Sequence, residues 1–128
     1  MPSREWENFD RHYPYCWGTS DVKGANNVPV QSDSCIPWIQ MYEHAEPPDC
    51  DAIPDASVRN TYYSSNCINR HDGGVNVLFM DWSARKVGLK ELWTLKWNRQ
   101  FDTAGEWTKA GWVRPEDWPQ WMRNFKDY

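Results

Sequence analysis

The alternation of apolar and polar positions is clearest in the third quarter of the chain. In residues 75–81, Val75, Val77 and Phe79 alternate on one face, and Leu78 and Met80 lie on the other face. Because successive side chains of a strand point to opposite faces, this stretch predicts a strand that is at least half covered on both faces. A turn at residues 82–84 and a second alternation in residues 85–89 follow. Together they predict a β-hairpin.

Helical periodicity replaces this alternation after the hairpin. Apolar residues recur three and four positions apart in residues 90–98, which predicts a helix. A second helix is expected over residues 115–128, with Asp117 as its N-terminal cap and Pro119 in its first turn. The residues between them, 99–114, are expected to form a loop. The tryptophans expected to pack on the two helical faces are Trp93, Trp97, Trp118 and Trp121.

The first 70 residues are rich in proline and in polar turn residues, so they are expected to be mostly loop with short strands. Residues 58–63 have the composition of a strand, and residues 36–42 fit a short strand or a turn of helix. Residues 43–55 combine five acidic residues with three prolines and are expected to form an exposed acidic loop. The predicted fold class is α+β, with a small antiparallel sheet, the hairpin and short C-terminal helices. A length of 128 residues fits one globular domain, residues 1–128.

The four cysteines, Cys16, Cys35, Cys50 and Cys67, are widely spaced and include no Cys-x-x-Cys pair. Zinc sites and redox motifs usually contain such a pair. Two disulfides are therefore expected to stabilise the loop-rich N-terminal half, which implies an oxidising compartment. Three connectivities are possible, and the nested one, Cys35–Cys50 with Cys16–Cys67, is favoured. Four buried free thiols are the alternative.

Composition and charge exclude several classes of protein. Aromatic residues make up 16% of the chain, including ten tryptophans, so an aromatic core is expected in place of an aliphatic one. The net charge of −4 argues against nucleic-acid binding, which needs a basic surface. No apolar run is long enough to span a membrane, and no secretory signal is present. Residues 1–70 contain five basic and ten acidic residues, whereas residues 71–128 contain nine and eight.

Candidate chemical sites are few, and no catalytic residues are assigned. The motifs of zinc proteases, serine hydrolases and phosphate-binding loops are absent from the sequence. Two groups of oxygen-bearing residues fit a hard cation such as Ca²⁺, although a solvated acidic loop is the alternative for each. The first group is His44, Glu46, Asp49 and Asp51, and the second is Asp102 and Glu106.

Trp107 and Trp112 lie in the predicted loop at residues 99–114, outside both helical faces. At least one of the two rings is expected to be exposed, since large exposed aromatic surface often marks a binding site. Exposed indole rings stack on sugar rings, so this loop favours a carbohydrate-binding module as one interpretation. Packing of both rings in the core is the other interpretation.

The segment from Asn69 to Trp82 resembles a motif of pseudopilin-like proteins of type II secretion, in the branch that is abundant in planctomycetes. That motif is a histidine, nine further residues and then Asp-Gly; here His71 is followed by nine residues and Asp81. Gly73 and Gly74 fit the pattern, whereas Trp82 stands where the family has glycine. The resemblance extends over residues 66–128.

This resemblance implies the soluble head domain of a pseudopilin-like subunit, without the basic leader and apolar membrane helix that begin such proteins. It implies a non-catalytic role in filament or secretion assembly outside the cytoplasm: in the periplasm, at the cell surface or in the medium. The implied partners are other pseudopilin-type subunits or secretion components. Some major pseudopilins bind Ca²⁺. The alternatives are a carbohydrate-binding module that uses exposed tryptophan, and a small metal-dependent extracellular enzyme built on His12, His44 or His71.

The two polar ends of the motif are not expected to touch each other. Seven residues of strand span about 23 Å, which is far beyond hydrogen-bonding distance. His71 and Asp81 are therefore expected to act separately, each fixing a turn. Asp81 is expected to accept backbone N–H groups in the turn at residues 82–84.

Overall fold

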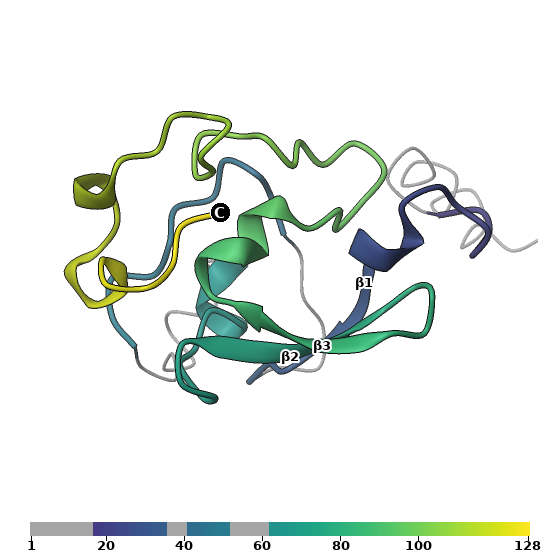
Figure 1. The fold of residues 1–128 in the computed structure, drawn as a ribbon, viewed down its shortest axis with the longest axis horizontal. Coiled ribbons are helices and arrows are strands. Elements are labelled where there is room, and N and C mark those ends of the chain that lie inside the picture. The colour runs from purple at the N-terminus through teal and green to yellow at the C-terminus, as the bar shows by residue number, and fades with distance from the viewer. Residues whose placement is uncertain (1–16, 36–40, 52–61) are drawn as a thin grey trace, which may run out of the picture.

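The structure is a computed structural model that describes residues 17–35, 41–51 and 62–128. Three antiparallel strands, β1 (Pro29–Ser32), β2 (Gly74–Phe79) and β3 (Ala84–Gly88), form one sheet in the order β1-β2-β3 (Figure 1). Short 3-10 helices make up the other regular structure: η1 (Ala25–Asn27), η2 (Tyr62–Ser65), η3 (Lys90–Thr94), η4 (Pro115–Asp117) and η5 (Gln120–Met122). The predicted small antiparallel sheet is confirmed, and the helices are shorter than predicted.

The predicted hairpin is β2 and β3, with Val75 opposite Val87. The Phe79 N–H donates to the Ser83 carbonyl at 2.8 Å, and the Trp82 N–H donates to the Phe79 carbonyl at 2.9 Å. The face of β2 that carries Val75 and Phe79 is fully buried, while the opposite face is partly covered. The alternation in the sequence therefore predicted both the strand pair and the buried face.

Strand β1 has no counterpart among the predicted elements. It pairs with β2 through Gln31 opposite Leu78 and Ser32 opposite Val77, and its register shifts after Pro29. The Met80 N–H donates to the Val28 carbonyl at 2.8 Å, just before the strand begins. These four residues, Pro-Val-Gln-Ser, have no alternating pattern of their own, so the pairing with β2 defines this strand.

Two predictions for the N-terminal half fall largely outside the described residues. In the stretch 36–42, residues 36–40 lie outside the described part of the chain. In the stretch 58–63, residues 58–61 lie outside it. The end of the second stretch is described, and Tyr62 and Tyr63 belong to helix η2. The predicted strand is therefore wrong at these two residues.

The predicted helix at residues 90–98 ends early, at Thr94. Leu95 is extended, with φ −85° and ψ 145°. The next N–H, that of Lys96, donates at 2.9 Å to the carbonyl of Asn27. The Asn27 side-chain amide in turn donates at 2.9 Å to the Thr94 carbonyl. Backbone groups that would continue the helix are thus bonded to Asn27, the last residue of η1, instead.

The predicted helix at residues 115–128 is replaced by the two short helices η4 and η5. Trp118 lies between them and is extended, with ψ 147°. A proline disfavours the helical conformation of the residue before it, and Trp118 precedes Pro119. The prediction of one continuous helix was wrong because it considered only the fit of Pro119 itself.

The core contains a cluster of packed aromatic rings, but most of its buried residues are not aromatic, among them Val75, Leu89 and Leu92. The expectation of an aromatic core in place of an aliphatic one is therefore wrong, because the few aliphatic residues of the chain are concentrated in the core. Trp93 stacks on Tyr63 with a centroid distance of 3.8 Å and meets Trp118 edge-on at 5.3 Å. Trp107 joins them at 5.2 Å from Trp118. Trp93 and Trp118 are fully buried, while Trp97 and Trp121 are partly buried. Backbone carbonyls accept from three of the indoles: Ala45 from Trp93, Leu92 from Trp97 and Pro48 from Trp121.

A buried lysine connects η3 to the C-terminal segment. The side chain of Lys90 is 0% exposed, and its Nζ lies 2.7 Å from Oδ1 of Asp127. The same nitrogen lies 5.1 Å from the centroid of the Trp118 ring and donates at 3.4 Å to the Arg123 carbonyl. The helical periodicity predicted an apolar face here but gave no sign that a lysine would be part of the core.

The cysteines correct the prediction of a disulfide-stabilised half. Cys35, Cys50 and Cys67 are free thiols, so the favoured Cys35–Cys50 bridge is not formed. Cys16 lies outside the described residues, but its predicted partner Cys67 is free and buried, and burial raises the pKa of the Cys67 thiol. The cysteine spacing therefore no longer supports an oxidising compartment.

Candidate functional site

Asp81, the last residue of the His71-to-Asp81 motif, lies in the turn between β2 and β3. Oδ1 of Asp81 accepts the Ser83 N–H at 2.9 Å and also the Ser83 hydroxyl. These hydrogen bonds hold the pKa of the Asp81 carboxyl below its usual range. The prediction that Asp81 fixes this turn is confirmed.

Trp82 completes the same turn in an uncommon backbone conformation. Its φ is +66°, which is the left-handed region. A three-residue hairpin loop usually needs this conformation at its last position, and glycine adopts it at least cost. Here the position carries an indole that is 79% exposed.

The histidine of the motif lies at the other end of β2. Nε2 of His71 is 3.0 Å from Oδ2 of Asp33, and the same oxygen accepts the Asn76 N–H at 2.9 Å. Gly73, with φ +82°, forms the turn into β2, and Gly74 begins the strand. His71 and Asp81 thus have separate partners, as expected, but Asp33 could not be identified as one of them from the sequence.

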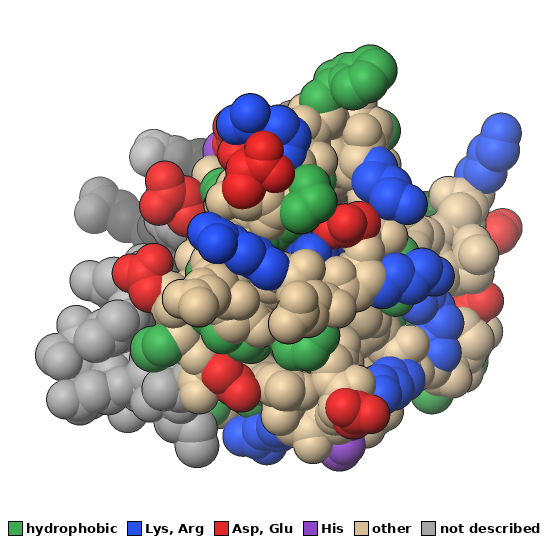
Figure 2. All heavy atoms as spheres, turned by 60° about the vertical axis from the view of Figure 1, so that its left-hand side comes forward, with side chains coloured by type: hydrophobic (Ala, Val, Ile, Leu, Met, Phe, Trp, Pro, Cys, Tyr) green, Lys and Arg blue, Asp and Glu red, His purple; other side chains and the backbone are tan. Residues whose placement is uncertain are grey.

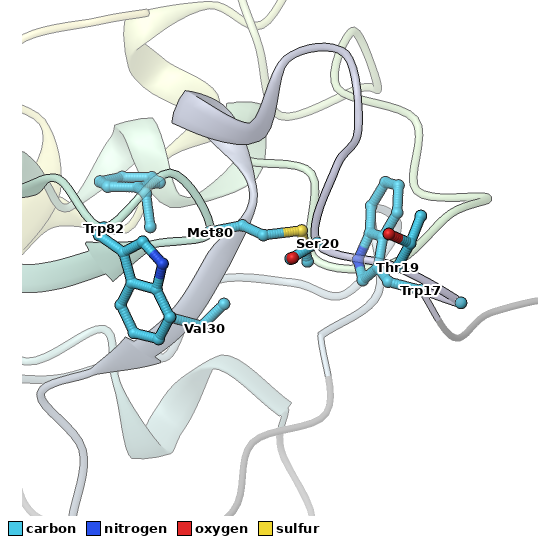
Figure 3. Close-up of a pocket in the computed structure, with 8 residues that line it drawn as sticks. Trp17, Thr19, Ser20, Val30, Met80 and Trp82 are labelled. Carbon is cyan, nitrogen blue, oxygen red and sulfur yellow. The ribbon is translucent and has the colours of Figure 1, made fainter.

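An apolar groove of about 340 Å³ lies beside Trp82 (Figure 3). Trp82 and Val30 are on one side of it and Trp17 and Thr19 on the other, with Met80 between them. The Met80 sulfur points toward Ser20. The groove joins three separate segments of the chain, and its full lining is Trp17, Gly18, Thr19, Ser20, Val30, Phe79, Met80 and Trp82.

The loop before η4 presents a second exposed tryptophan. Trp112 is 88% exposed, whereas Trp107 packs into the aromatic core. The prediction that at least one of these two rings is exposed is confirmed. Trp112 has φ +68°, so both strongly exposed tryptophans have left-handed backbones. That conformation costs an L-residue about 1–2 kcal/mol, and neither ring recovers this cost by burial within the chain.

The predicted cation sites are not assembled. Nδ1 of His44 is 3.3 Å from Oε1 of Glu106, so one residue of each predicted group meets in an exposed ion pair. Asp51 accepts the Asn69 N–H at 3.0 Å, and Asp102 accepts the Ala104 N–H at 2.9 Å. Within residues 17–35, 41–51 and 62–128, no three His, Cys, Asp or Glu side chains form a group that could hold a metal ion.

The face of the molecule drawn in Figure 2 is mixed in charge. Lys and Arg side chains are spread over the face in Figure 2, and Asp and Glu side chains lie among them. In the described part of the chain, no helix has both the length and the apolar character needed to cross a bilayer.

No protein-family model, curated protein or solved structure matches this chain. The sequence did not single out the groove, because its lining residues are distant along the chain. The only sequence feature that could have indicated the groove was Trp82, a large apolar residue in a predicted turn.

Proposed function

We propose that this chain is the head domain of a pseudopilin-like subunit and acts by contact with other proteins outside the cytoplasm. The observation that carries the proposal is Trp82, which exposes a large indole beside an apolar groove while its backbone is in an unfavourable conformation. Sparsely populated backbone conformations tend to persist where function requires them. Exposed apolar surface next to a concave site is typical of interfaces.

The local structure of the motif supports the resemblance to pseudopilin-like proteins. Gly73 takes a positive φ, Asp81 closes the hairpin turn, and position 82 has the conformation that glycine would favour. Gly73 and Asp81 therefore occupy positions where a glycine backbone and a carboxylate acceptor, respectively, suit the local structure. The extracytoplasmic location rests on this resemblance.

Carbohydrate binding remains the second candidate function, because Trp112 exposes its ring as that function requires. It is less well supported, since Trp107 is packed against Trp118 and is not available as a second stacking surface. The groove offers the hydroxyls of Thr19 and Ser20 among mostly apolar side chains. Sugar recognition usually needs more polar groups than this, since a buried polar group without a partner is costly.

The proposal is tested by placing a photo-crosslinking amino acid at position 82 in cells that express the full gene. Asn124, which is exposed and follows η5 at the end of the molecule opposite the β2–β3 turn in Figure 1, is the matched control position. Position 82 is expected to crosslink to a pilin-type subunit, identified by mass spectrometry, and position 124 is not. If position 82 crosslinks only to glycan, or forms no crosslink, the proposal is contradicted.

A further inference from the structure

We infer that a pocket between the sheet and the C-terminal segment binds a phosphate group, either as free phosphate or on a small organic phosphomonoester. The pocket forms where three segments meet: the turn into β2, the end of β3 and residues 124–128. Its volume is about 340 Å³, which is within the range of small-molecule sites. The turn into β2 is at the left-hand end of the sheet in Figure 1, whereas the Trp82 turn is at the right-hand end. This inference is therefore independent of the proposed function.

Two glycines let aromatic rings of the C-terminal segment pack directly on the sheet. A Cβ on Gly88 would lie 2.6 Å from the Tyr128 hydroxyl oxygen, so a larger residue would displace the Tyr128 ring. A Cβ on Gly73 would lie 3.3 Å from the Phe125 ring. The main-chain oxygen of Tyr128 accepts the N–H of Lys109, which is outside the pocket lining, at 2.7 Å. The pocket walls are therefore preorganised, which lowers the entropic cost of binding.

Two lysines line the pocket, and among the described residues neither ammonium group has a carboxylate partner. Nζ of Lys86 donates at 3.0 Å to the main-chain carbonyl of Asp72. Nζ of Lys126 lies 4.8 Å from the centroid of the Tyr128 ring. A lysine ammonium has three N–H donors, so each of the two retains at least two N–H groups that can donate to a ligand. A carbonyl and a ring also leave the positive charges in place.

Two acidic residues close in sequence to the lining are already paired with other cations. Oε1 of Glu91 lies 2.7 Å from Nη1 of Arg85. Oδ1 of Asp127 lies 2.7 Å from Nζ of Lys90. Asp72 is the one acidic residue of the lining, so two lysines and one aspartate give the lining side chains a net charge of +1. The pocket is therefore suited to an anion.

The donors of the lining favour a tetrahedral phosphate over a planar carboxylate. Arginine recognises carboxylates through two parallel hydrogen bonds, whereas lysine acts as a point charge and is a common phosphate ligand. The lining contains two lysines and no arginine, and Asn124 and Tyr128 add an amide and a hydroxyl. Burial raises the pKa of Tyr128, so its hydroxyl remains a protonated donor at neutral pH. The rings of Phe125 and Tyr128 offer apolar surface to the organic part of a phosphomonoester.

The test titrates the isotope-labelled 128-residue chain with inorganic phosphate, and separately with phenyl phosphate, at constant ionic strength. The backbone N–H resonances of Gly73 and Gly88 are followed by NMR. Both are expected to shift and to saturate, with a Kd for inorganic phosphate on the order of 1–10 mM. Tighter binding of phenyl phosphate would identify the ligand as an organic phosphomonoester, and equal or weaker binding would identify it as free phosphate. Acetate, a planar anion, is expected to cause no saturable shift over the same range.

Three variants at exposed positions of the pocket test the electrostatic argument. Lys86→Met and Lys126→Met are each expected to weaken phosphate binding by about 2- to 5-fold, since each removes one exposed charge. Asp72→Asn is expected to strengthen binding, because it removes the one acidic side chain of the lining. Asparagine tolerates the left-handed backbone of Asp72, whose φ is +51°.

Lys23→Met is the matched control, because Lys23 is also exposed but is not part of the pocket lining. It is expected to leave phosphate binding unchanged. The inference is overturned if phosphate causes no saturable shift up to about 50 mM, or if acetate binds as tightly as phosphate. It is also overturned if Lys23→Met weakens binding as much as Lys86→Met and Lys126→Met do.

Discussion

Trp93→Ala is expected to lower the free energy of unfolding by about 3–5 kcal/mol, the usual cost of removing a buried aromatic ring. Trp93 lies at the centre of the aromatic core, stacked on Tyr63 and edge-on to Trp118. The change would also leave the Ala45 carbonyl without the indole N–H that it accepts at 3.0 Å. Urea unfolding followed by circular dichroism measures the loss.

Two further variants keep this prediction informative if Trp93→Ala does not fold. Trp93→Phe retains most of the packing and is expected to lose less. Trp112→Gly is the matched control, because it removes an exposed ring and relieves a left-handed backbone. It is expected to be as stable as the natural chain or more stable. A loss from Trp112→Gly as large as that from Trp93→Ala would contradict the division into core and surface tryptophans.

Asp127→Asn is expected to cost about 2–3 kcal/mol, because it leaves the buried Lys90 ammonium without its counter-charge. The Asp127 side chain is 33% exposed, so water offsets part of the cost and the loss stays below that of a fully buried pair. Lys90→Met is expected to cost less, since it removes the buried charge itself and keeps the packing against Trp118. Urea unfolding of each single variant measures the two losses in free energy of unfolding and tests this order.

The double variant Lys90→Met/Asp127→Asn checks the reason for that order. If Asp127 matters because it neutralises Lys90, the double variant is expected to be about as stable as Lys90→Met alone. Additive losses would show that the two side chains act independently. A smaller loss from Asp127→Asn than from Lys90→Met would mean that packing of the lysine stem is the dominant contribution.

The parts of the fold that the sequence predicted are those fixed by local patterns. The hairpin followed from alternation over Val75, Val77 and Phe79, because the period of a strand does not depend on distant residues. The turn role of Asp81 followed from the tendency of aspartate to accept nearby backbone N–H groups. The aromatic content correctly indicated that aromatic rings are part of the core, but it did not show that they share it with a larger number of non-aromatic residues.

The parts that it missed depend on contacts between distant segments. Helix η3 ends where Asn27 donates to the Thr94 carbonyl and accepts the Lys96 N–H. Strand β1 exists because β2 is available to pair with it. Trp107 and Trp112 lie in the same loop, but Trp107 packs against Trp93 and Trp118 while Trp112 is exposed. The groove joins residues from three segments and leaves no pattern along the chain.

The prediction of two disulfides failed for a different reason. Their even number and wide spacing fit a disulfide framework, but the same spacing fits thiols that lie apart from one another. Cys67 is buried beside Met122, with its sulfur 4.0 Å from the Met122 sulfur, and behaves as a small apolar core residue. Spacing alone cannot distinguish the two arrangements.

The proposal that this chain is the head domain of a pseudopilin-like subunit is tested most directly by the reading frame that precedes the Met1 codon in the chromosome. If the proposal is right, this frame encodes a short basic leader followed by about 20 mainly apolar residues, enough for a helix that spans a membrane. A stop codon directly upstream, with translation beginning at Met1, would contradict the proposal. A cleavable secretory signal with no lasting apolar helix would also contradict it, and would favour a secreted binding module.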